Sequence, residues 1–281
     1  MKEAIAQALV EDAPQGDITS EYIISPDSVA TAELRAREPG IMSGTAVLVE
    51  VFNQIDPHVT VNLHIEDAQH FNAGTVLATL SGNAQAILRG ERVALNFLQR
   101  MCGIATLTSH FVNAVAQTNA KILDTRKTTP GLRMFERMAV IHGGGNNHRF
   151  SLSDAVLLKD NHLAVIAGSG KNLTSELLDL RDKLSKGIVI EVEVDRVDQI
   201  PAVLDGNVDI IMLDNFSTAQ LREGVSIING RALVEASGGV TIDSVAEIAK
   251  TGVDRISVGS LTHSARALDI ALDIDIQAPE A

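Results

Sequence analysis

Charged and small polar residues stand at the ends of six predicted strands in the second half of the chain. These positions are Thr125 to Lys127, Lys159, Glu193, Asp214, Ser237 to Gly239, and Val258 to Ser260. In β/α barrels the chemistry lies where strands end and loops begin. A single acid or base at such a place is commonly a solvated surface group. Six polar strand ends together favour an enzyme site for an anionic substrate.

Basic residues are concentrated near the first two of these strands. The chain has a net charge of −13, yet the segment from Arg92 to His162 contains nine lysines and arginines and only four acidic residues. The glycine-rich segment GGGNNHR, residues 143–149, ends in His148 and Arg149. An arginine fork pairs bidentately with carboxylate or phosphate. His148 and Arg149, together with Arg126 and Lys159 on neighbouring loops, predict a pocket for a small dianion. Arg133 and Arg137 are interpreted as surface charges.

The acidic and small strand ends suit different ligands. Glu193 lies among apolar residues in IVIEVEV, where a carboxylate needs a partner or a metal. Glu193 and Asp214 are suited to sugar hydroxyls and to Mg²⁺, held directly or through water. The ASGG and VGS segments fit a phosphate site, because glycine lets backbone N–H groups approach an anion closely. Each glycine segment alone is a weak signal.

Composition excludes several classes of protein. The chain has 281 residues, 45% of them hydrophobic, with one tyrosine and no tryptophan, which favours an α/β core of aliphatic residues. The acidic net charge argues against a general nucleic-acid binder, and no run approaches the ~20 apolar residues of a membrane helix. The single Cys102 allows no internal disulfide, and the first residues do not resemble a secretory signal, so a cytoplasmic protein is expected. No zinc, P-loop or GxSxG motif is present.

The elements that must position these residues differ between the two halves. The first half reads as α+β, with a helix from Lys2 to Glu11 and strand-like runs at 30–37, 59–65 and 76–80. A helical pattern from Arg92 to about Ala116, interrupted at Gly103, reads as a bridge between domains.

The second half alternates strands with helices. Strand-like runs stand at 121–125, 154–159, 188–194, 208–213, 231–237 and 253–258. Helical patterns separate the later ones, with Ser217 and Thr241 as N-caps. This repeat predicts a parallel sheet, either doubly wound or a β/α barrel. A polar residue on every strand favours the barrel, because a doubly wound sheet concentrates its ligand site at one switch point.

Several motifs, in order, resemble nicotinate-nucleotide pyrophosphorylase (carboxylating), also called quinolinate phosphoribosyltransferase. They are GDITS (16–20), ILRGERVALNFLQRMCGIAT (87–106), DTRKTTPGLR (124–133), GGGNNHR (143–149), LLKDNH (157–162), EVEVD (191–195), IIMLDN (210–215), EASGG (235–239) and ISVGSLTHS (256–264). Departures at Met101-Cys102 and Arg137-Met138 touch no assigned position. The resemblance implies an α/β fold: an N-terminal α/β sandwich domain (1–110) and an open TIM-like β/α barrel (111–270), with a tail (271–281) able to return to the N-terminal domain.

The resemblance also implies an activity and a residue assignment. Quinolinate and phosphoribosyl pyrophosphate, with Mg²⁺, would give nicotinate mononucleotide, pyrophosphate and CO₂ for NAD biosynthesis, in a homodimer or a larger assembly of dimers. The quinolinate carboxylates would be held by Arg126, His148, Arg149 and Lys159, with Arg92 reaching in from a neighbouring subunit. Lys127 would meet the pyrophosphate, Glu193 and Asp214 the ribose and Mg²⁺, and Ser237, Gly238, Gly239, Val258, Gly259 and Ser260 the phosphate. Thr125 also falls in this substrate site, and the chemistry would rest on Lys127, Lys159, Glu193 and Asp214.

Two alternatives remain at this point. A molybdenum-transport-associated homologue would share the fold, but its carboxylate pocket need not keep the four basic residues. A non-catalytic phosphate-binding barrel would have no reason to keep Lys127, Glu193 and Asp214 together.

Overall fold

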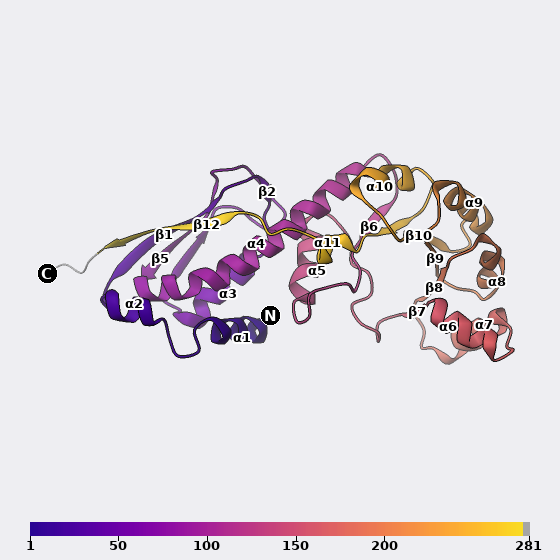
Figure 1. Cartoon of the computed structure of the whole chain (residues 1–281), viewed down its shortest axis with the longest axis horizontal. Coiled ribbons are helices and arrows are strands. Elements are labelled where there is room, and N and C mark those ends of the chain that lie inside the picture. The colour runs from indigo at the N-terminus through magenta and orange to yellow at the C-terminus, as the bar shows by residue number, and fades with distance from the viewer. Residues whose placement is uncertain (278–281) are drawn as a thin grey trace. The chain divides into compact units, whose positions relative to one another are not determined.

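The computed structural model describes residues 1–277, whose contacts form two compact units (Figure 1). Unit 1 comprises Met1–Ser109, Thr128–Gly144 and the chain from Leu261 onward, and unit 2 comprises His110–Lys127 and Gly145–Ser260. The linear boundaries expected at 110 and 270 do not describe this grouping, because two stretches inside the second half belong with unit 1. Each unit is described separately below.

Unit 1 is built on a four-stranded antiparallel sheet with the order β12-β1-β5-β3. Its strands are β1 (Val29–Ala36), β3 (Thr60–Leu63), β5 (Val76–Asn83) and β12 (Ile270–Gln277). In β1 alternate residues Ala30, Ala32, Leu34 and Ala36 are buried, so one face of the sheet packs against the core. The described part of the expected tail thus forms most of β12 beside β1 in unit 1, and residues 278–281 lie outside the described chain.

Helices complete unit 1. They are α1 (Lys2–Asp12), α2 (Ile18–Ile23), α3 (Thr45–Ile55), α4 (Ala84–Ala114) and α5 (Arg133–His142). Helix α4 extends into unit 2, and α11 (Ser260–His263) begins at the boundary between the units. A short strand β2 (Gly40–Ile41) pairs with β4 (His70–Phe71). The GDITS motif has a structural use here, because the Asp17 carboxylate caps α2 by accepting hydrogen bonds from the Thr19 and Ser20 amides.

Helix α4 corrects one expectation. It runs for 31 residues and is not interrupted at Gly103. Glycine usually weakens a helix interior by about 1 kcal/mol relative to alanine. Here the missing side chain is needed, since a Cβ on Gly103 would stand 2.0 Å from the carbonyl oxygen of Arg266. The glycine therefore marks a close backbone approach.

Unit 2 contains a parallel six-stranded sheet with the order β6-β11-β10-β9-β8-β7. The strands are β6 (Lys121–Leu123), β7 (Val156–Leu158), β8 (Ile190–Val194), β9 (Ile210–Asp214), β10 (Leu233–Ser237) and β11 (Arg255–Ser257). Strands β6 and β7 follow each other in the chain but form opposite edges. This is the cyclic strand order of a β/α barrel left open between its first two strands, which confirms the expected fold class.

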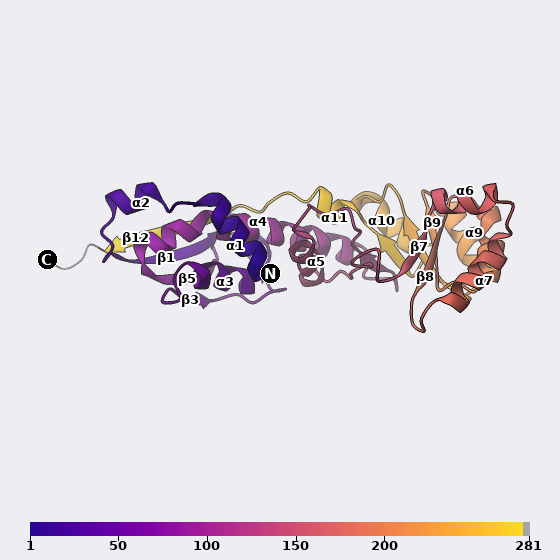
Figure 2. The ribbon, with the colours of Figure 1, turned by 90° about the horizontal axis from the view of Figure 1, so that it is seen from below.

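Helices cover the outer face of the unit 2 sheet (Figure 2). They are α6 (Asp160–Gly168), α7 (Leu173–Lys183), α8 (Ile200–Asp205, preceded by a 3₁₀ turn Val197–Gln199), α9 (Thr218–Ile228) and α10 (Ile242–Ala249). Ser217 and Thr241 cap α9 and α10 as predicted, each with a reciprocal capping box. The opposite face of the sheet is the inner face, on which alternate residues of each strand meet.

Candidate active site

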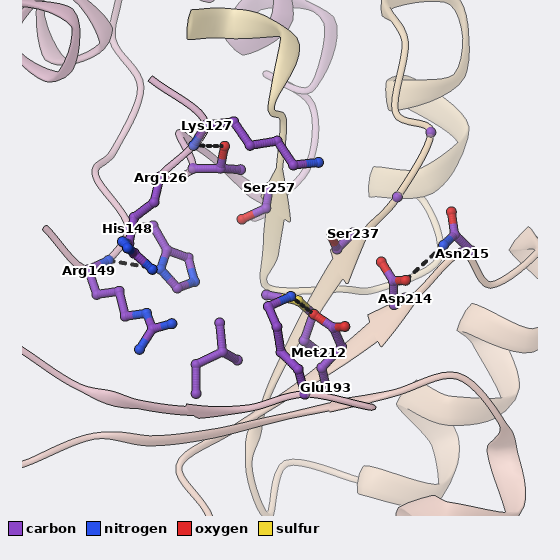
Figure 3. Close-up of a pocket in the computed structure, with 15 residues that line it drawn as sticks. Arg126, Lys127, His148, Arg149, Glu193, Met212, Asp214, Asn215, Ser237 and Ser257 are labelled. Atoms are coloured by element: carbon purple, nitrogen blue, oxygen red, sulfur yellow. Dashed lines mark hydrogen bonds and ion pairs between the residues drawn. The ribbon is translucent and has the colours of Figure 1, made fainter. Parts of the chain in front are cut away.

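The polar strand ends of unit 2 meet in one cavity of about 540 Å³ on the inner face of the open barrel (Figure 3). Its lining residues are Thr125, Arg126, Lys127, His148, Arg149, Leu157, Lys159, Glu193, Met212, Asp214, Asn215, Ser237, Gly238, Gly239 and Ser257. A cavity of this size suits small-molecule substrates. All but four of the residues assigned from the sequence are therefore brought together.

A cationic wall lines one side of this pocket. Arg126, Lys127, His148 and Arg149 lie on the loops after β6 and before β7 (Figure 3). Burial and the neighbouring charge of Arg126 lower the pKa of Arg149. The Nε atom of Arg126 is buried and has no hydrogen-bond partner among the described residues. An unused donor on Arg126 beside the guanidinium of Arg149 makes this wall a site that suits an anion.

The acidic wall lies at the ends of β8 and β9. Glu193 forms an ion pair with Lys159, which supplies the partner that the sequence pattern required. Asp214 accepts a hydrogen bond of 2.7 Å from the Asn215 side chain. The cationic and acidic walls thus stand on opposite sides of one pocket, joined through Lys159.

The donor set fits Mg²⁺. Glu193, Asp214 and Asn215 offer only oxygen ligands toward the same space, and all three also line an adjoining cavity of about 660 Å³. Hard oxygen donors are the ligands that Mg²⁺ takes, with several waters retained. One feature qualifies the fit: the Glu193 carboxylate is already balanced by Lys159, so Asp214 carries the charge that is left for a cation.

The small residues after β10 form a backbone cradle. Gly238 and Gly239 have φ angles of +89° and +59°, in the left-handed region. A Cβ on Gly238 would lie 2.2 Å from the Asn215 side-chain oxygen. Glycine is therefore required at 238 both by backbone conformation and by space.

Four assigned residues do not line the pocket. Arg92 is an exposed residue of α4 in unit 1. The side chain of Val258 is buried, and its amide donates to the Leu123 carbonyl at 2.9 Å. Gly259 and Ser260 follow at the start of α11 without contributing to the lining.

A buried polar cluster beneath the cationic wall was missed by sequence reasoning. His148 Nε2 lies 3.0 Å from a Glu191 carboxylate oxygen and 3.4 Å from one of Glu235, and the Ser257 hydroxyl donates to Glu235. The strand pattern could have located one member, because Glu191 lies two residues before Glu193 and such residues point to the same face. Nothing local in the sequence indicated that the loop bearing His148 reaches both strands.

The cluster holds more negative charge than its single ring can balance. Burial lowers the pKa of His148, but hydrogen bonds and charges from Glu191 and Glu235 outweigh it and raise the pKa to about 10. Burial raises the pKa of Glu191. The Arg149 amide donates to Nδ1 of the ring at 2.8 Å, so a proton on Nδ1 would face another proton. The raised pKa values mean that the cluster keeps one proton beyond that of a neutral ring at pH 7. Because Nδ1 already accepts a hydrogen bond, we place this proton on Glu191 and the single ring proton on Nε2.

The same three residues are also the one group in the described chain with the composition and spacing of a metal site. Their ligand atoms all lie within 4.8 Å of one another. The Ser257 hydrogen bond to Glu235 and the Nε2–H contact to Glu191 give these groups protein partners instead.

Comparisons with known proteins agree with this architecture. The family descriptions "Quinolinate phosphoribosyl transferase, N-terminal domain" and "C-terminal domain" match residues 17–102 and 104–273. The chain is 42% identical over 295 aligned residues to quinolinate phosphoribosyltransferase [decarboxylating] 2b, mitochondrial, of Nicotiana tabacum, covering 99% of this chain and 83% of that protein.

Solved structures give the same result over nearly the whole chain. The nicotinate-nucleotide pyrophosphorylase of Francisella tularensis superposes with a TM-score of 0.90 at 38% identity, covering 98% of this chain and 95% of that one. NadC of Streptococcus pyogenes superposes with a TM-score of 0.92 at 36% identity, covering 99% and 96%. Fold, pocket and similarity together place this chain in the quinolinate phosphoribosyltransferase family.

Proposed function

We propose that the protein is a quinolinate phosphoribosyltransferase (decarboxylating). It converts quinolinate and phosphoribosyl pyrophosphate to nicotinate mononucleotide, pyrophosphate and CO₂, a reaction of NAD biosynthesis. The observation that carries the proposal is the pairing of two walls in one pocket. The guanidinium groups of Arg126 and Arg149 suit a dicarboxylate, and the acids and glycines opposite suit a ribose with its phosphates.

The pocket supports this chemistry by positioning and by charge. The cationic wall would hold the two carboxylates so that the ring nitrogen faces C1 of the ribose. The nitrogen bonds to C1 as the bond from C1 to pyrophosphate breaks, and the pyrophosphate leaves with the electron pair. All three line this pocket: Glu193 and Asp214 would stabilise the positive charge that develops on the sugar, and Lys127 would meet the departing anion.

Decarboxylation follows from the substrate's own electronics. Once the ring nitrogen is quaternary, the C2 carboxylate can leave as CO₂, because the cationic ring stabilises the electron pair left on carbon. That carbon then takes a proton from solvent. Among the residues lining the pocket, the arginines would keep the remaining carboxylate in place during this step.

Mg²⁺ belongs to the proposal as well. When bound, it would neutralise charge on the pyrophosphate and orient it. Asp214, Glu193 and Asn215 are the residues placed to hold it, directly or through water. Asp214→Asn should therefore raise the KM for phosphoribosyl pyrophosphate more than the KM for quinolinate, and equal increases would count against this division of roles.

Assembly and location are part of the proposal. Arg92 is exposed on α4 and lines no part of the unit 2 pocket, which supports a homodimer, or a larger assembly of dimers, in which Arg92 completes a partner's site. The single cysteine supports a reducing, cytoplasmic location. Within residues 1–277, no helix combines the length and apolar character that crossing a membrane requires.

Release of CO₂ from carboxyl-labelled quinolinate tests the function. Release should depend on phosphoribosyl pyrophosphate and Mg²⁺, and nicotinate mononucleotide should form in equal amount. A protein that binds phosphate but releases no CO₂ would be a non-catalytic barrel instead. Removal of divalent metal by a chelator should abolish turnover, and added Mg²⁺ should restore it.

A further inference from the structure

The His148 ring is held from both of its nitrogen atoms by the protein. Nε2 faces Glu191 on β8 and Glu235 on β10, at 3.0 and 3.4 Å. Nδ1 accepts a hydrogen bond of 2.8 Å from the Arg149 amide. The ring therefore connects the inner face of the barrel to the backbone of the arginine that lines the pocket (Figure 3).

The surrounding contacts fix this connection in place. The His148 amide donates to the Asp124 carboxylate at 2.7 Å, and Asp124 is fully buried at the end of β6. The Arg149 guanidinium donates to the Ala155 carbonyl at 3.0 Å. Main chain and side chains of residues 148 and 149 are thus anchored to three strands and to one loop, as an orienting group for the pocket would be.

Packing alone does not account for the acids in this cluster. Glu191 and Glu235 are 2% and 0% exposed, and each has one carboxylate oxygen without a hydrogen-bond partner among the described residues. Of the neighbouring charges, Arg255 on β11 acts on Glu191. Buried acids under a pocket for anions are costly and would repel the ligand. Such an arrangement persists where it has a specific use.

We propose that Glu191 and Glu235 are positioning residues for substrate recognition. They hold His148 by Nε2, which leaves Nδ1 to fix the Arg149 backbone and thereby the direction of its guanidinium. Ser257 fixes Glu235 in turn. His148 acts in this scheme through Arg149 rather than by donating a ring proton to the ligand. The identity of the ligand, a dicarboxylate, rests on the proposed function. The geometry around His148 does not depend on it.

The ring-nitrogen NMR signals of His148 test the geometry without any turnover. The signals are assigned by their loss in His148→Asn. At pH 7 the ligand-free protein should show a protonated Nε2 and an unprotonated Nδ1. Glu191→Gln and Glu235→Gln should each replace this pattern with averaged signals. An averaged ring in the wild type, a proton on Nδ1, or an Nε2 that binds a divalent metal would each overturn the proposal.

A kinetic cycle tests the consequence for recognition. Glu191→Gln should raise the quinolinate KM at least tenfold while the KM for phosphoribosyl pyrophosphate changes less than twofold. In the His148→Asn background the same substitution should change the quinolinate KM less than twofold, because the intermediary is gone. Equal effects in both backgrounds, or parallel increases in both KM values, would show a general structural role.

Two further measurements keep the outcomes distinct. If Glu191→Gln does not fold, Ser257→Ala removes only the hydroxyl that holds Glu235. It should raise the quinolinate KM about threefold while the KM for phosphoribosyl pyrophosphate changes less than twofold, and an unchanged quinolinate KM would contradict the scheme. If wild-type protein releases no CO₂ from quinolinate, the proposed function fails, and the NMR pattern still decides whether Glu191 and Glu235 orient His148.

Discussion

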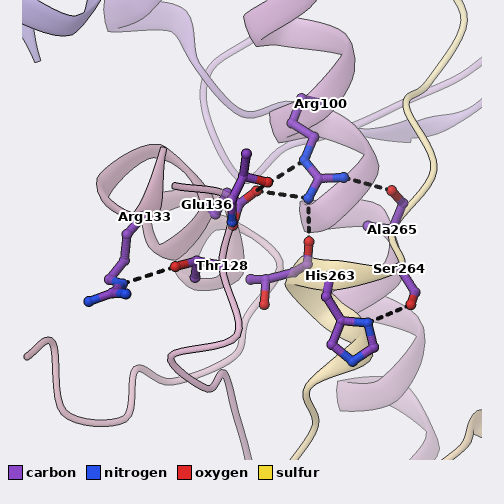
Figure 4. Close-up of polar contacts among 9 residues, drawn as sticks. Arg100, Thr128, Arg133, Glu136, His263, Ser264 and Ala265 are labelled. Atoms are coloured by element: carbon purple, nitrogen blue, oxygen red, sulfur yellow. Dashed lines mark hydrogen bonds and ion pairs between the residues drawn. The ribbon is translucent and has the colours of Figure 1, made fainter. Parts of the chain in front are cut away.

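Buried carboxylates occur in both units, but their surroundings differ. In unit 1, Glu136 is fully buried and accepts hydrogen bonds from Nε and Nη2 of Arg100, at 3.2 and 2.7 Å (Figure 4). It also accepts hydrogen bonds from the hydroxyl and the amide of Thr129, at 2.8 and 3.1 Å. The same arginine donates to the carbonyls of Thr262 and Ala265. In unit 2, Glu191 and Glu235 share one imidazole and retain unpaired oxygens.

The difference separates a structural centre from a functional one. Both carboxylate oxygens of Glu136 accept hydrogen bonds, and its charge is balanced by Arg100. Through Arg100 this ion pair connects α4, α5 and the chain around Thr262. The unit 2 acids are incompletely paired, as is the guanidinium of Arg126 in the pocket. Incomplete pairing is costly for folding but leaves groups ready for a ligand, which agrees with the tendency of perturbed groups to gather at functional sites.

The largest effect is expected from breaking the matched centre. Glu136→Ala would leave the Arg100 guanidinium without its carboxylate and would remove the acceptor of the Thr129 hydroxyl and amide. We expect unfolding free energy to fall by about 3 to 5 kcal/mol, measured by urea denaturation. The control Glu247→Gln removes an exposed partner of Lys250 and should leave the urea midpoint unchanged. A Glu136 variant as stable as its control would end the structural interpretation.

Removing a donor from the pocket should show the opposite behaviour. Arg149→Ala deletes one guanidinium of the cationic wall, and the unpaired carboxylate of the substrate should cost about 2 to 5 kcal/mol in kcat/KM for quinolinate. Because burial and the like charge of Arg126 both disfavour the charged form of this arginine, its loss should change stability little. Steady-state kinetics and thermal unfolding measure both quantities. Wild-type kinetics would remove Arg149 from the site.

The two units should also respond to pH in opposite directions. In unit 1, hydrogen bonds from Arg266 and the Asp269 amide lower the pKa of Glu38 to about 2. A lowered pKa gives stability that is present above the unfolded value and lost as pH falls toward 2. In unit 2 the pKa of His148 is raised to about 10 from 6.5, and that of Glu191 is also raised, so this stability is full below about pH 6.5 and lost as pH rises through 10.

Stability measured against pH would check these signs. We expect the unfolding free energy to fall by about 2 kcal/mol between pH 7 and 9, because the folded protein keeps one proton that the unfolded chain has already released. Glu191→Gln should remove most of this alkaline decrease and leave the acid limb intact. Glu38→Gln should do the reverse. An alkaline decrease that persists in Glu191→Gln would place the extra proton elsewhere.

Local sequence patterns predicted the elements and strand ends but not the contacts between distant segments. The alternation of strands and helices from residue 121 onward was sufficient for the parallel sheet, because that periodicity is local. Pairing of β12 with β1 joins residues about 240 positions apart and leaves no local mark. Gly103 was read as a helix interruption because the carbonyl that it accommodates lies far along the chain.

The site shows the same division. Residues at strand ends were found because position and residue type together indicate chemistry. Glu235 belongs to the EASGG motif, but the sequence does not mark it as a site residue, because a buried carboxylate inside a strand has no local signature of its partner. Ser257 was missed for the same reason, although it lies within a predicted strand and is the last residue of β11. Val258 is predicted as part of a strand end that fits a phosphate, but its amide and side chain are used by the barrel itself.

The smallest expected effect separates glycines that share a conformation. Gly238 in unit 2 and Gly74 in unit 1 have φ angles of +89° and +84°. A Cβ on Gly74 would meet nothing within 4 Å, whereas one on Gly238 would meet Asn215 at 2.2 Å. Gly74→Ala should therefore cost only the left-handed strain, about 1 kcal/mol, with unchanged kinetics.

Gly238→Ala adds a displacement of Asn215 to the same strain. We expect a cost of about 2 kcal/mol in urea denaturation and a higher KM for phosphoribosyl pyrophosphate, because Asn215 hydrogen-bonds Asp214. Asn215→Ala removes the side-chain part of the clash and serves as the matched background. In it Gly238→Ala should cost less than in the wild type but more than Gly74→Ala, because the backbone nitrogen of residue 215 would still lie 2.9 Å from the new Cβ. If the cost of Gly238→Ala is unchanged in that background, the glycine serves only the turn, and the contrast between a functional and a structural glycine fails at this position.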